Sequence, residues 1–274
     1  MIPTQFDYAA PASLADAVSL LESRPGAKAM GGGHRLLADL RRKRRSVPLL
    51  VDLRKIPGLY GVTTTNGSGL VVGAMTSLAD LLGNANGALA DAIRGTTEPQ
   101  VRNQRTVGGA AAANDRAAHV PAALLALGAE VTVAGVGGAL TTMGYADFLG
   151  GRATSTGRIL TSIRIPAKGS SAYCVIPHAA NGLAIVGVAA QVVVSGGRIG
   201  SASLAVTGAG EQPQRVASLE AALVGADAAG DLSGICAKHG LACRTDLWAS
   251  AEYRAHVVGV LAADAVRAAA QRAS

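Results

Sequence analysis

Two glycine-rich segments, each followed by a helix-forming stretch, constrain this chain more than any other feature of its sequence. The first contains Gly31-Gly32-Gly33 and leads into a basic segment, and the second contains Gly108-Gly109 and leads into an alanine run. Glycine leaves room where a ligand must touch the main chain, and the free N–H groups at a helix start favour an anion such as a phosphate. The two segments lie about 75 residues apart and fit one extended ligand with a charged centre.

The second segment has polar residues in front of its glycines. Arg102, Asn103, Arg105 and Thr106 are potential hydrogen-bond donors, and Pro99 biases the residue before it away from helix. The alternative interpretation is an ordinary Gly-Gly turn before an alanine-rich helix. Neither segment matches the usual dinucleotide-binding or P-loop patterns, so the ligand class stays open on motif grounds alone.

Composition predicts a globular protein of one large domain or two. The chain has 274 residues, of which 49% are hydrophobic and 16% charged. The net charge is +7, and much of the excess lies in the run Arg41-Arg42-Lys43-Arg44-Arg45. This run is a solvated helix end, a docking site for an acidic partner, or a source of attraction for an anionic ligand. Only 3% of residues are aromatic and no nucleic-acid-binding module is recognisable, which argues against nucleic acid as a partner.

The chain has few residues suited to metals or nucleophilic catalysis. Its three cysteines form no C-x-x-C pair, so an iron–sulfur cluster or structural zinc of its own is not expected, nor is a disulfide framework. The spacing of the five histidines indicates no metal site, and hydrolase motifs are absent from the sequence. No signal-peptide pattern and no transmembrane segment is predicted, so a cytoplasmic location is expected.

The order of predicted elements indicates two lobes and a smaller C-terminal unit. For the first lobe, about residues 1–57, we predict a helix over 11–23, a strand over 27–30, a helix over 36–42 and a strand over 49–53. For the second, about residues 58–167, we predict strands over 70–73, 130–134, 139–142 and 159–165 and helices over 77–82, 87–94, 110–113 and 121–127. Ser13 followed by Asp16 is typical of a capping box.

The C-terminal unit, residues 171–274, follows a short linker that begins at Lys168. Residues 184–195 and 198–207 are predicted to form an antiparallel hairpin around Gly196-Gly197. Helices are predicted over 216–223 and 252–272, the second with an apolar stripe suited to core packing.

With these residues in view, the sequence resembles the FAD-binding medium subunits of the molybdenum hydroxylases, a family that includes carbon monoxide dehydrogenase and the flavin domain of xanthine dehydrogenase. The family's first loop reads Ala-Gly-Gly, then His, Thr or Gln, then Ser or Asp, then Leu, and Gly31 to Leu36 stand in it. The second reads R-N-x-x-T-I/V-G-G and is followed by an Asp. The matching residues here are Arg102, Asn103, Thr106, Val107, Gly108, Gly109 and Asp115. The segments 159–166 and 177–190 also resemble the family, so the resemblance covers essentially the whole chain.

The resemblance implies an α+β fold: a two-lobed α/β FAD-binding domain over 1–167, of the p-cresol methylhydroxylase/vanillyl-alcohol oxidase-like type, and a C-terminal α+β domain over 171–274 with an antiparallel sheet and helices. It implies an oxidoreductase subunit whose FAD accepts electrons from the iron–sulfur clusters of a small subunit and passes them to an external acceptor. Molybdopterin and the substrate belong to a large subunit, and a dimer of heterotrimers is expected. The alternatives are a stand-alone FAD-dependent oxidase of the same superfamily, a member that binds FAD weakly, and a basic nucleic-acid-binding protein.

No catalytic residue is assigned to this chain. The cofactor-binding residues that the resemblance implies are Gly31, Gly32, Gly33, His34, Arg35, Leu36, Arg102, Asn103, Thr106, Val107, Gly108, Gly109, Ala110, Asp115, Leu160 and Tyr173. The glycines would bring N–H groups to the pyrophosphate, Thr106 would add a hydroxyl, and Asp115 would accept from a flavin-side or ribityl hydroxyl. Leu160 would pack on the isoalloxazine ring, with Tyr173 beside it.

Two positions depart from the family pattern. Position 35, usually Ser or Asp, is Arg, which would strengthen pyrophosphate binding or block the usual hydroxyl contact. The Lys that often follows the Tyr at 173 is replaced by Cys174 and Val175, and its loss would lower the flavin potential or change the choice of acceptor.

Overall fold

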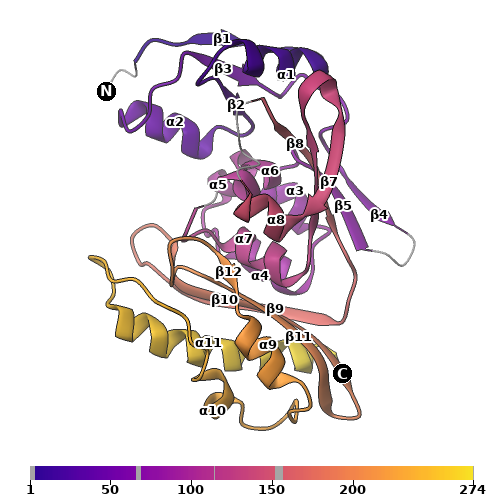
Figure 1. The fold of residues 1–274 in the computed structure, drawn as a ribbon, viewed down its shortest axis with the longest axis vertical. Coiled ribbons are helices and arrows are strands. Elements are labelled where there is room, and N and C mark those ends of the chain that lie inside the picture. The colour runs from indigo at the N-terminus through magenta and orange to yellow at the C-terminus, as the bar shows by residue number, and fades with distance from the viewer. Residues whose placement is uncertain (1–3, 66–68, 114, 152–156, 274) are drawn as a thin grey trace.

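The described residues form three β-sheets along the longest axis of the molecule, with helices between and around them (Figure 1). The structure is a computed structural model and describes residues 4–65, 69–113, 115–151 and 157–273. The N-terminal lobe, the central lobe and the C-terminal domain follow one another in chain order, from indigo to yellow in Figure 1. The mixed helix and sheet content confirms the predicted α+β class.

The first lobe is a small parallel sheet with two helices. Its strands, in the spatial order β1-β3-β2, are β1 (Asp7–Ala9), β3 (Leu49–Asp52) and β2 (Lys28–Met30). Its helices are α1 (Leu14–Ser23) and α2 (His34–Arg41). All four residues of β3 are buried, as expected for a central parallel strand. Ser13 accepts a hydrogen bond of 3.1 Å from the Asp16 N–H, which confirms the predicted helix start.

The central lobe is an antiparallel five-stranded sheet packed against several short helices. Its strands, in spatial order, are β4 (Val62–Thr65), β5 (Gly69–Gly73), β8 (Ile159–Ile165), β6 (Glu130–Ala134) and β7 (Leu140–Gly144). Its helices are α3 (Leu78–Leu82), α4 (Gly87–Arg94), α5 (Pro99–Gln104), α6 (Val107–Ala112), α7 (His119–Ala126) and α8 (Tyr145–Gly150), and a 3₁₀ turn spans Val136–Gly138. Every residue of α7 is buried, so this helix forms the centre of the largest core.

The C-terminal domain is an antiparallel four-stranded sheet with its own helices packed against it. Its strands, in spatial order, are β12 (Gln214–Arg215), β11 (Arg198–Thr207), β10 (Ala184–Ser195) and β9 (Ser170–Pro177). Its helices are α9 (Ala217–Leu223), α10 (Ser233–Cys236) and α11 (Ala251–Gln271). The predicted hairpin is confirmed, with positive φ at both Gly196 (56°) and Gly197 (76°), as a two-residue turn of this kind requires. Helices α9 and α11 pack against this sheet, α10 packs against α9 and α11, and α4 and α7 of the central lobe also contact the sheet.

A buried histidine connects the central lobe with the C-terminal domain. His119 of α7 is hydrogen bonded through Nδ1 to the Tyr173 hydroxyl on β9 (2.8 Å) and through Nε2 to the Gly182 carbonyl (2.8 Å). Nε2 faces a carbonyl and must therefore carry the proton, so Nδ1 accepts from Tyr173. This arrangement requires a neutral imidazole, and burial accordingly lowers the pKa of His119.

The lowered pKa predicts a pH-dependent stability. In the unfolded chain a histidine has its ordinary pKa of about 6.5, so on acidification the unfolded state takes up the proton first. The stabilising contribution of neutral His119 is therefore present above about pH 6.5 and is lost as the pH falls below that value. In urea titrations between pH 7.5 and 5, His119→Gln should reduce the pH dependence of the free energy of unfolding. His256→Gln, at an exposed position on α11, should leave it unchanged. If the free energy of unfolding depended on pH equally in wild type and in His119→Gln, the assignment of this pH dependence to His119 would be contradicted.

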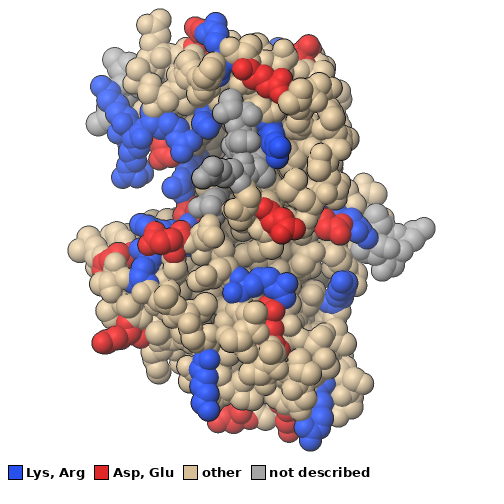
Figure 2. All heavy atoms as spheres, viewed as in Figure 1, with Lys and Arg blue, Asp and Glu red and all other residues tan. Residues whose placement is uncertain are grey.

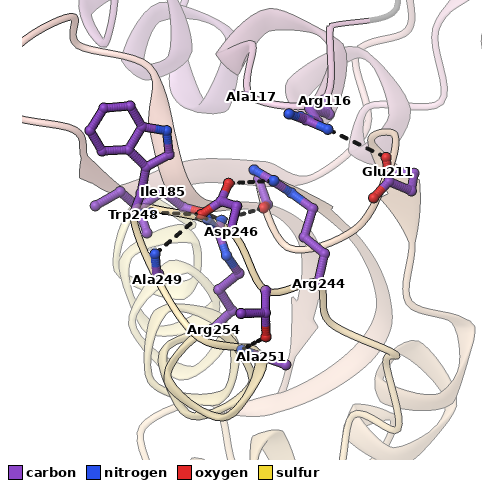
Figure 3. Close-up of polar contacts among 12 residues, drawn as sticks. Arg116, Ala117, Ile185, Glu211, Arg244, Asp246, Trp248, Ala249, Ala251 and Arg254 are labelled. Atoms are coloured by element: carbon purple, nitrogen blue, oxygen red, sulfur yellow. Dashed lines mark hydrogen bonds and ion pairs between the residues drawn. The ribbon is translucent and has the colours of Figure 1, made fainter.

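A buried arginine ties α11 to the sheet beneath it. Arg254 is 1% exposed and donates to the carbonyls of Ile185 and Gly208 at the ends of β10 and β11. Its second Nη bonds Asp246 (2.7 Å), which also pairs with Arg244 and accepts from the Trp248 N–H (2.9 Å), as Figure 3 shows. Hydrogen bonds from these partners hold the pKa of Asp246 well below its usual range despite the opposing effect of burial. The cluster fixes the segment that leads into α11.

We expect Arg254→Met to lower the free energy of unfolding by about 3 kcal/mol, since it removes one member of a buried charged cluster and leaves two carbonyls without donors. Arg267→Met is the matched control. Arg267 lies on the same helix and forms an exposed pair with Asp264 (3.0 Å), so its loss should change stability by no more than about 0.5 kcal/mol. Chemical denaturation followed by circular dichroism measures both. If both variants lost a similarly small part of the free energy of unfolding, the buried cluster would contribute little to stability.

Candidate functional site

The two glycine segments lie in direct backbone contact. A Cβ atom on Gly32 would come within 1.8 Å of the Gln104 carbonyl oxygen, and one on Gly31 within 2.8 Å of Thr106 Oγ1. Only glycine allows this approach, because any side chain would push the segments apart. The first lobe and the central lobe therefore meet at their two glycine loops, as the idea of one shared ligand requires.

The first segment presents unpartnered backbone donors. Gly33 has φ 73° and precedes α2 without a side-chain cap. Among the described residues, the N–H groups of residues 32–36 make no hydrogen bond. The first residues of α2 thus combine free N–H groups with the positive end of a helix, which is a favourable environment for an anion.

The second segment differs from its prediction. Residues 99–104 form a short helix, α5, and Gly108-Gly109 lie inside the first turn of α6. Their N–H groups are already engaged: Gly108 donates to the Ala74 carbonyl (2.9 Å) and Gly109 to Thr106 Oγ1 (3.1 Å). These two amides are therefore engaged within the chain, and their contact with a cofactor stays a prediction. Gly108 is instead required by packing, since a Cβ there would lie 2.6 Å from that of Ala74.

A cavity of about 430 Å³, here called the loop cavity, lies where the two segments meet. Its walls include residues 27–36, Thr106, Gly109, Phe148 and Leu160. One carboxylate, Asp39, lines it, whereas the lining cations are Lys28, Arg35, Arg45, Arg105 and Arg158. Figure 2 shows Lys and Arg gathered on the left of the upper lobe, over α2. This excess of positive charge favours an anionic ligand.

A second cavity of about 810 Å³, here called the interdomain cavity, adjoins the first. It lies between α2, the segment from Asp115 to His119, and two C-terminal segments that include residues 181–185 and Trp248. Four residues line both cavities, namely His34, Arg35, Asp39 and Arg105. An extended ligand could therefore span both cavities past this shared junction.

Arg105 stands at that junction without an ion-pair partner among the described residues. Within the described residues, its guanidinium forms no hydrogen bond or ion pair. Burial lowers its pKa, with the nearby Asp115 opposing this effect and Arg35 adding to it. Burial also lowers the pKa of His34, helped by the charge of Arg105. A desolvated, unpaired cation is unfavourable, and a bound anion would relieve the cost. Sequence reasoning counted Arg105 among the donors but not among the cofactor-binding residues.

The remaining predicted residues divide between the cavities and the core. Gly31 to Leu36, Thr106, Gly109 and Leu160 line the loop cavity, and Asp115 lines the interdomain cavity. Neither lining includes Arg102, Asn103, Val107, Gly108, Ala110 or Tyr173.

The structure gives physical reasons for these exclusions. Arg102 donates to the carbonyls of Thr96 (2.6 Å) and Thr97 (2.8 Å), so it closes a turn. Val107 and Ala110 are fully buried in the core beneath α6, and Asn103 is exposed on α5. Tyr173 is 6% exposed and its hydroxyl is held by His119, so the prediction that it flanks the flavin is not supported. No signal in the sequence distinguishes this buried tyrosine from one that faces a ligand.

The departure at position 35 has a structural counterpart. Arg35 forms an ion pair with Asp115, which is 80 residues away in the sequence, and its Nε lies 3.8 Å from Asp39. The predicted hydroxyl-binding carboxylate, Asp115, is thus engaged by Arg35.

Among the described residues, no group of three or more His, Cys, Asp or Glu is arranged to hold a metal ion. In the same ranges, no helix has both the length and the apolar character needed to cross a bilayer.

Comparison with known proteins assigns the chain to a family. Residues 4–168 match the model of the FAD binding domain in molybdopterin dehydrogenase, and residues 171–269 match the CO dehydrogenase flavoprotein C-terminal domain. The chain belongs to this family of flavoprotein subunits of molybdenum-containing dehydrogenases, which are oxidoreductases.

Relatives of known name extend over the whole chain. The carbon monoxide dehydrogenase medium chain of Afipia carboxidovorans is 33% identical over 100% of this chain and 99% of its own. The nicotine 6-hydroxylase medium subunit of Paenarthrobacter nicotinovorans is 30% identical over 90% of this chain and 91% of its own. A chain in a solved structure of carbon monoxide dehydrogenase from Hydrogenophaga pseudoflava superposes with a TM-score of 0.92 at 30% identity, and both chains are covered completely. These matches support both the fold and the predicted resemblance.

The contact between the glycine segments can be tested directly. Gly32→Ala places a methyl group against the Gln104 carbonyl, so we expect a lower melting temperature and a free energy of unfolding reduced by about 2 kcal/mol. Gly135→Ala is the control, because a Cβ there meets nothing within 4 Å and the backbone φ is negative. Scanning calorimetry compares the two. Unchanged stability in Gly32→Ala would mean that the segments are not packed as described.

Proposed function

We propose that this chain binds FAD at the junction of the loop cavity and the interdomain cavity and serves as the electron-transfer subunit of a heterotrimeric molybdenum hydroxylase. In this role it accepts electrons from iron–sulfur clusters in a small partner subunit and passes them to an external acceptor. The observation that carries the proposal is that, among the described residues, the Arg105 guanidinium and the N–H groups of residues 32–36 have no hydrogen-bond partner and line the same cavity. Together they form a binding site, here called the seat, for the central diphosphate of the cofactor.

The residues present fit such a group. The backbone N–H groups at the start of α2 would donate to phosphate oxygens, and Arg105 would neutralise their charge. Thr106 adds a hydroxyl at the edge of the loop cavity, although this oxygen also caps α6. Leu160, 9% exposed, and Phe148 offer apolar surface to a ring system. That this ring is the isoalloxazine remains a prediction.

FAD supplies the redox chemistry when it is bound, and the protein supplies position and electrostatics. We assign no catalytic residue to this chain. The donors hold the diphosphate at the junction, and the walls of the two cavities orient the two halves of the molecule. Substrate chemistry would belong to a molybdopterin-binding large subunit.

The partners follow from the family, whose relatives include chains named as medium chains and medium subunits. We propose a complex with a molybdopterin-binding large subunit and an iron–sulfur small subunit, assembled as a dimer of heterotrimers. A cytoplasmic location remains a prediction from the sequence. A stand-alone FAD-dependent oxidase is the alternative, and it would be recognised by full activity of the isolated chain.

The test is reconstitution of the purified chain with FAD, followed by titration of flavin fluorescence. We expect one FAD per chain, and a dissociation constant raised about tenfold in Arg105→Met, since a charge-assisted contact to a phosphate contributes on the order of 1.5 kcal/mol. Arg164→Met is the control for the loss of a positive charge, because Arg164 pairs with Glu130 on the central sheet outside both cavities. A wild-type chain that retains no FAD would refute the proposal. Equal weakening by both substitutions would refute the assigned seat.

A further inference from the structure

The junction of the two cavities contains two arginines and one carboxylate that belong to different lobes. Arg35 lies on the first turn of α2 in the first lobe, whereas Arg105 and Asp115 flank α6 in the central lobe. The Arg35 side chain is 52% exposed and pairs with Asp115, whose side chain is 14% exposed. Arg105 has no partner among the described residues. One carboxylate therefore serves two neighbouring cations, and it engages the more exposed one.

We propose that the Arg35–Asp115 ion pair is a latch across the junction, and that the diphosphate of the bound cofactor opens it by taking Arg35 from Asp115. This inference rests on the proposed function and adds to it a competition between a carboxylate of the protein and the phosphates of the ligand. In the ligand-free chain the latch joins the two lobes. In the bound chain Arg35 and Arg105 both face the diphosphate, and Asp115 is released.

The geometry favours this exchange. Arg35 is itself one of the residues at the start of α2 whose N–H groups make no hydrogen bond among the described residues, so a diphosphate held there lies close to the Arg35 backbone. A diphosphate carries more negative charge than one carboxylate and accepts bidentate contacts from a guanidinium. Opening the latch also requires little free energy, because an ion pair with a half-exposed partner contributes little to stability. A long arginine side chain can turn from one acceptor to the other without a change in the backbone.

The released carboxylate gives the latch a role in specificity. Asp115 keeps a hydrogen bond from the Ala117 N–H (3.2 Å), so it stays in place at the wall of the interdomain cavity after Arg35 leaves. A ligand with hydroxyl groups on the far side of its diphosphate can donate to this carboxylate, and the ribityl chain of FAD carries such hydroxyl groups. A ligand that ends at its diphosphate, such as ADP, leaves Asp115 uncompensated. The latch therefore discriminates in favour of the complete cofactor.

The experiment measures ADP and FAD binding by calorimetry with full-length chain from which flavin has been removed. Asp115→Asn frees Arg35 from the start, so ADP should bind about fivefold more tightly, the factor that corresponds to about 1 kcal/mol for an accessible ion pair. The ratio of FAD affinity to ADP affinity should fall. Asp264→Asn removes one carboxylate from an exposed pair outside both cavities, and it should leave both affinities at the wild-type value.

An Asp115→Asn chain that binds ADP no more tightly than the Asp264→Asn control would overturn the latch. Thermal unfolding of each variant checks that it is folded. If Asp115→Asn does not fold, Arg35→Gln decides the question, because it removes latch and cation together. The latch then predicts faster FAD association with weaker final affinity in stopped-flow fluorescence, and association as slow as in wild type would overturn it.

The two proposals fail in different ways. If the wild-type chain binds neither FAD nor ADP, the proposed function fails and the latch with it. If the wild-type chain binds FAD, and neither substitution produces its expected change, only the latch fails. A uniform loss of FAD and ADP affinity in Asp115→Asn, with normal folding, would assign a purely structural role to the ion pair.

Discussion

The contact between the backbones of Gly31-Gly32 and residues 104–106 determines where everything else in the site can lie. A carbonyl oxygen of one lobe occupies the space that a Cβ atom would take in the other, so the two lobes approach more closely than any side chain would permit. This contact holds the start of α2 beside Arg105 and Thr106. The free N–H groups and the unpaired guanidinium then face the same small volume. Neither would define a binding site without the other.

The charges around this contact are arranged at a cost to the ligand-free protein. Arg105 is half-buried and forms no ion pair among the described residues, and the nearby carboxylate of Asp115 is held by Arg35. A protein that binds a dianionic group can keep such unfavourable charges because the ligand compensates them. The exposed basic run Arg41 to Arg45 lies at the C-terminal end of α2. Three of its members, Arg42, Arg44 and Arg45, line the cavities. Its position favours attraction of an anion among the functions considered from sequence.

Several elements could be predicted because their signals are local. The Ser13 cap, the hairpin around Gly196-Gly197 and the apolar α7 each depend on residues close together in the sequence. Strand β9 was missed because its first residues read as part of a linker, and only pairing with β10 makes the segment a strand. Helix α5 was missed for a similar reason, since its polar residues resemble those of a loop. The domain limits remain a prediction.

By itself the sequence determined the two glycine segments, the order of the lobes and the family resemblance, because these depend only on residue types and their spacing along the chain. Only the tertiary structure decided which donors are free. The amides of Gly108 and Gly109 are satisfied by Ala74 and Thr106, Tyr173 is buried against His119, and Asp115 is paired with Arg35. Most of these partners lie more than 30 residues away in the sequence. A motif reports which groups a segment carries, whereas hydrogen bonding and burial depend on what the rest of the chain brings beside them.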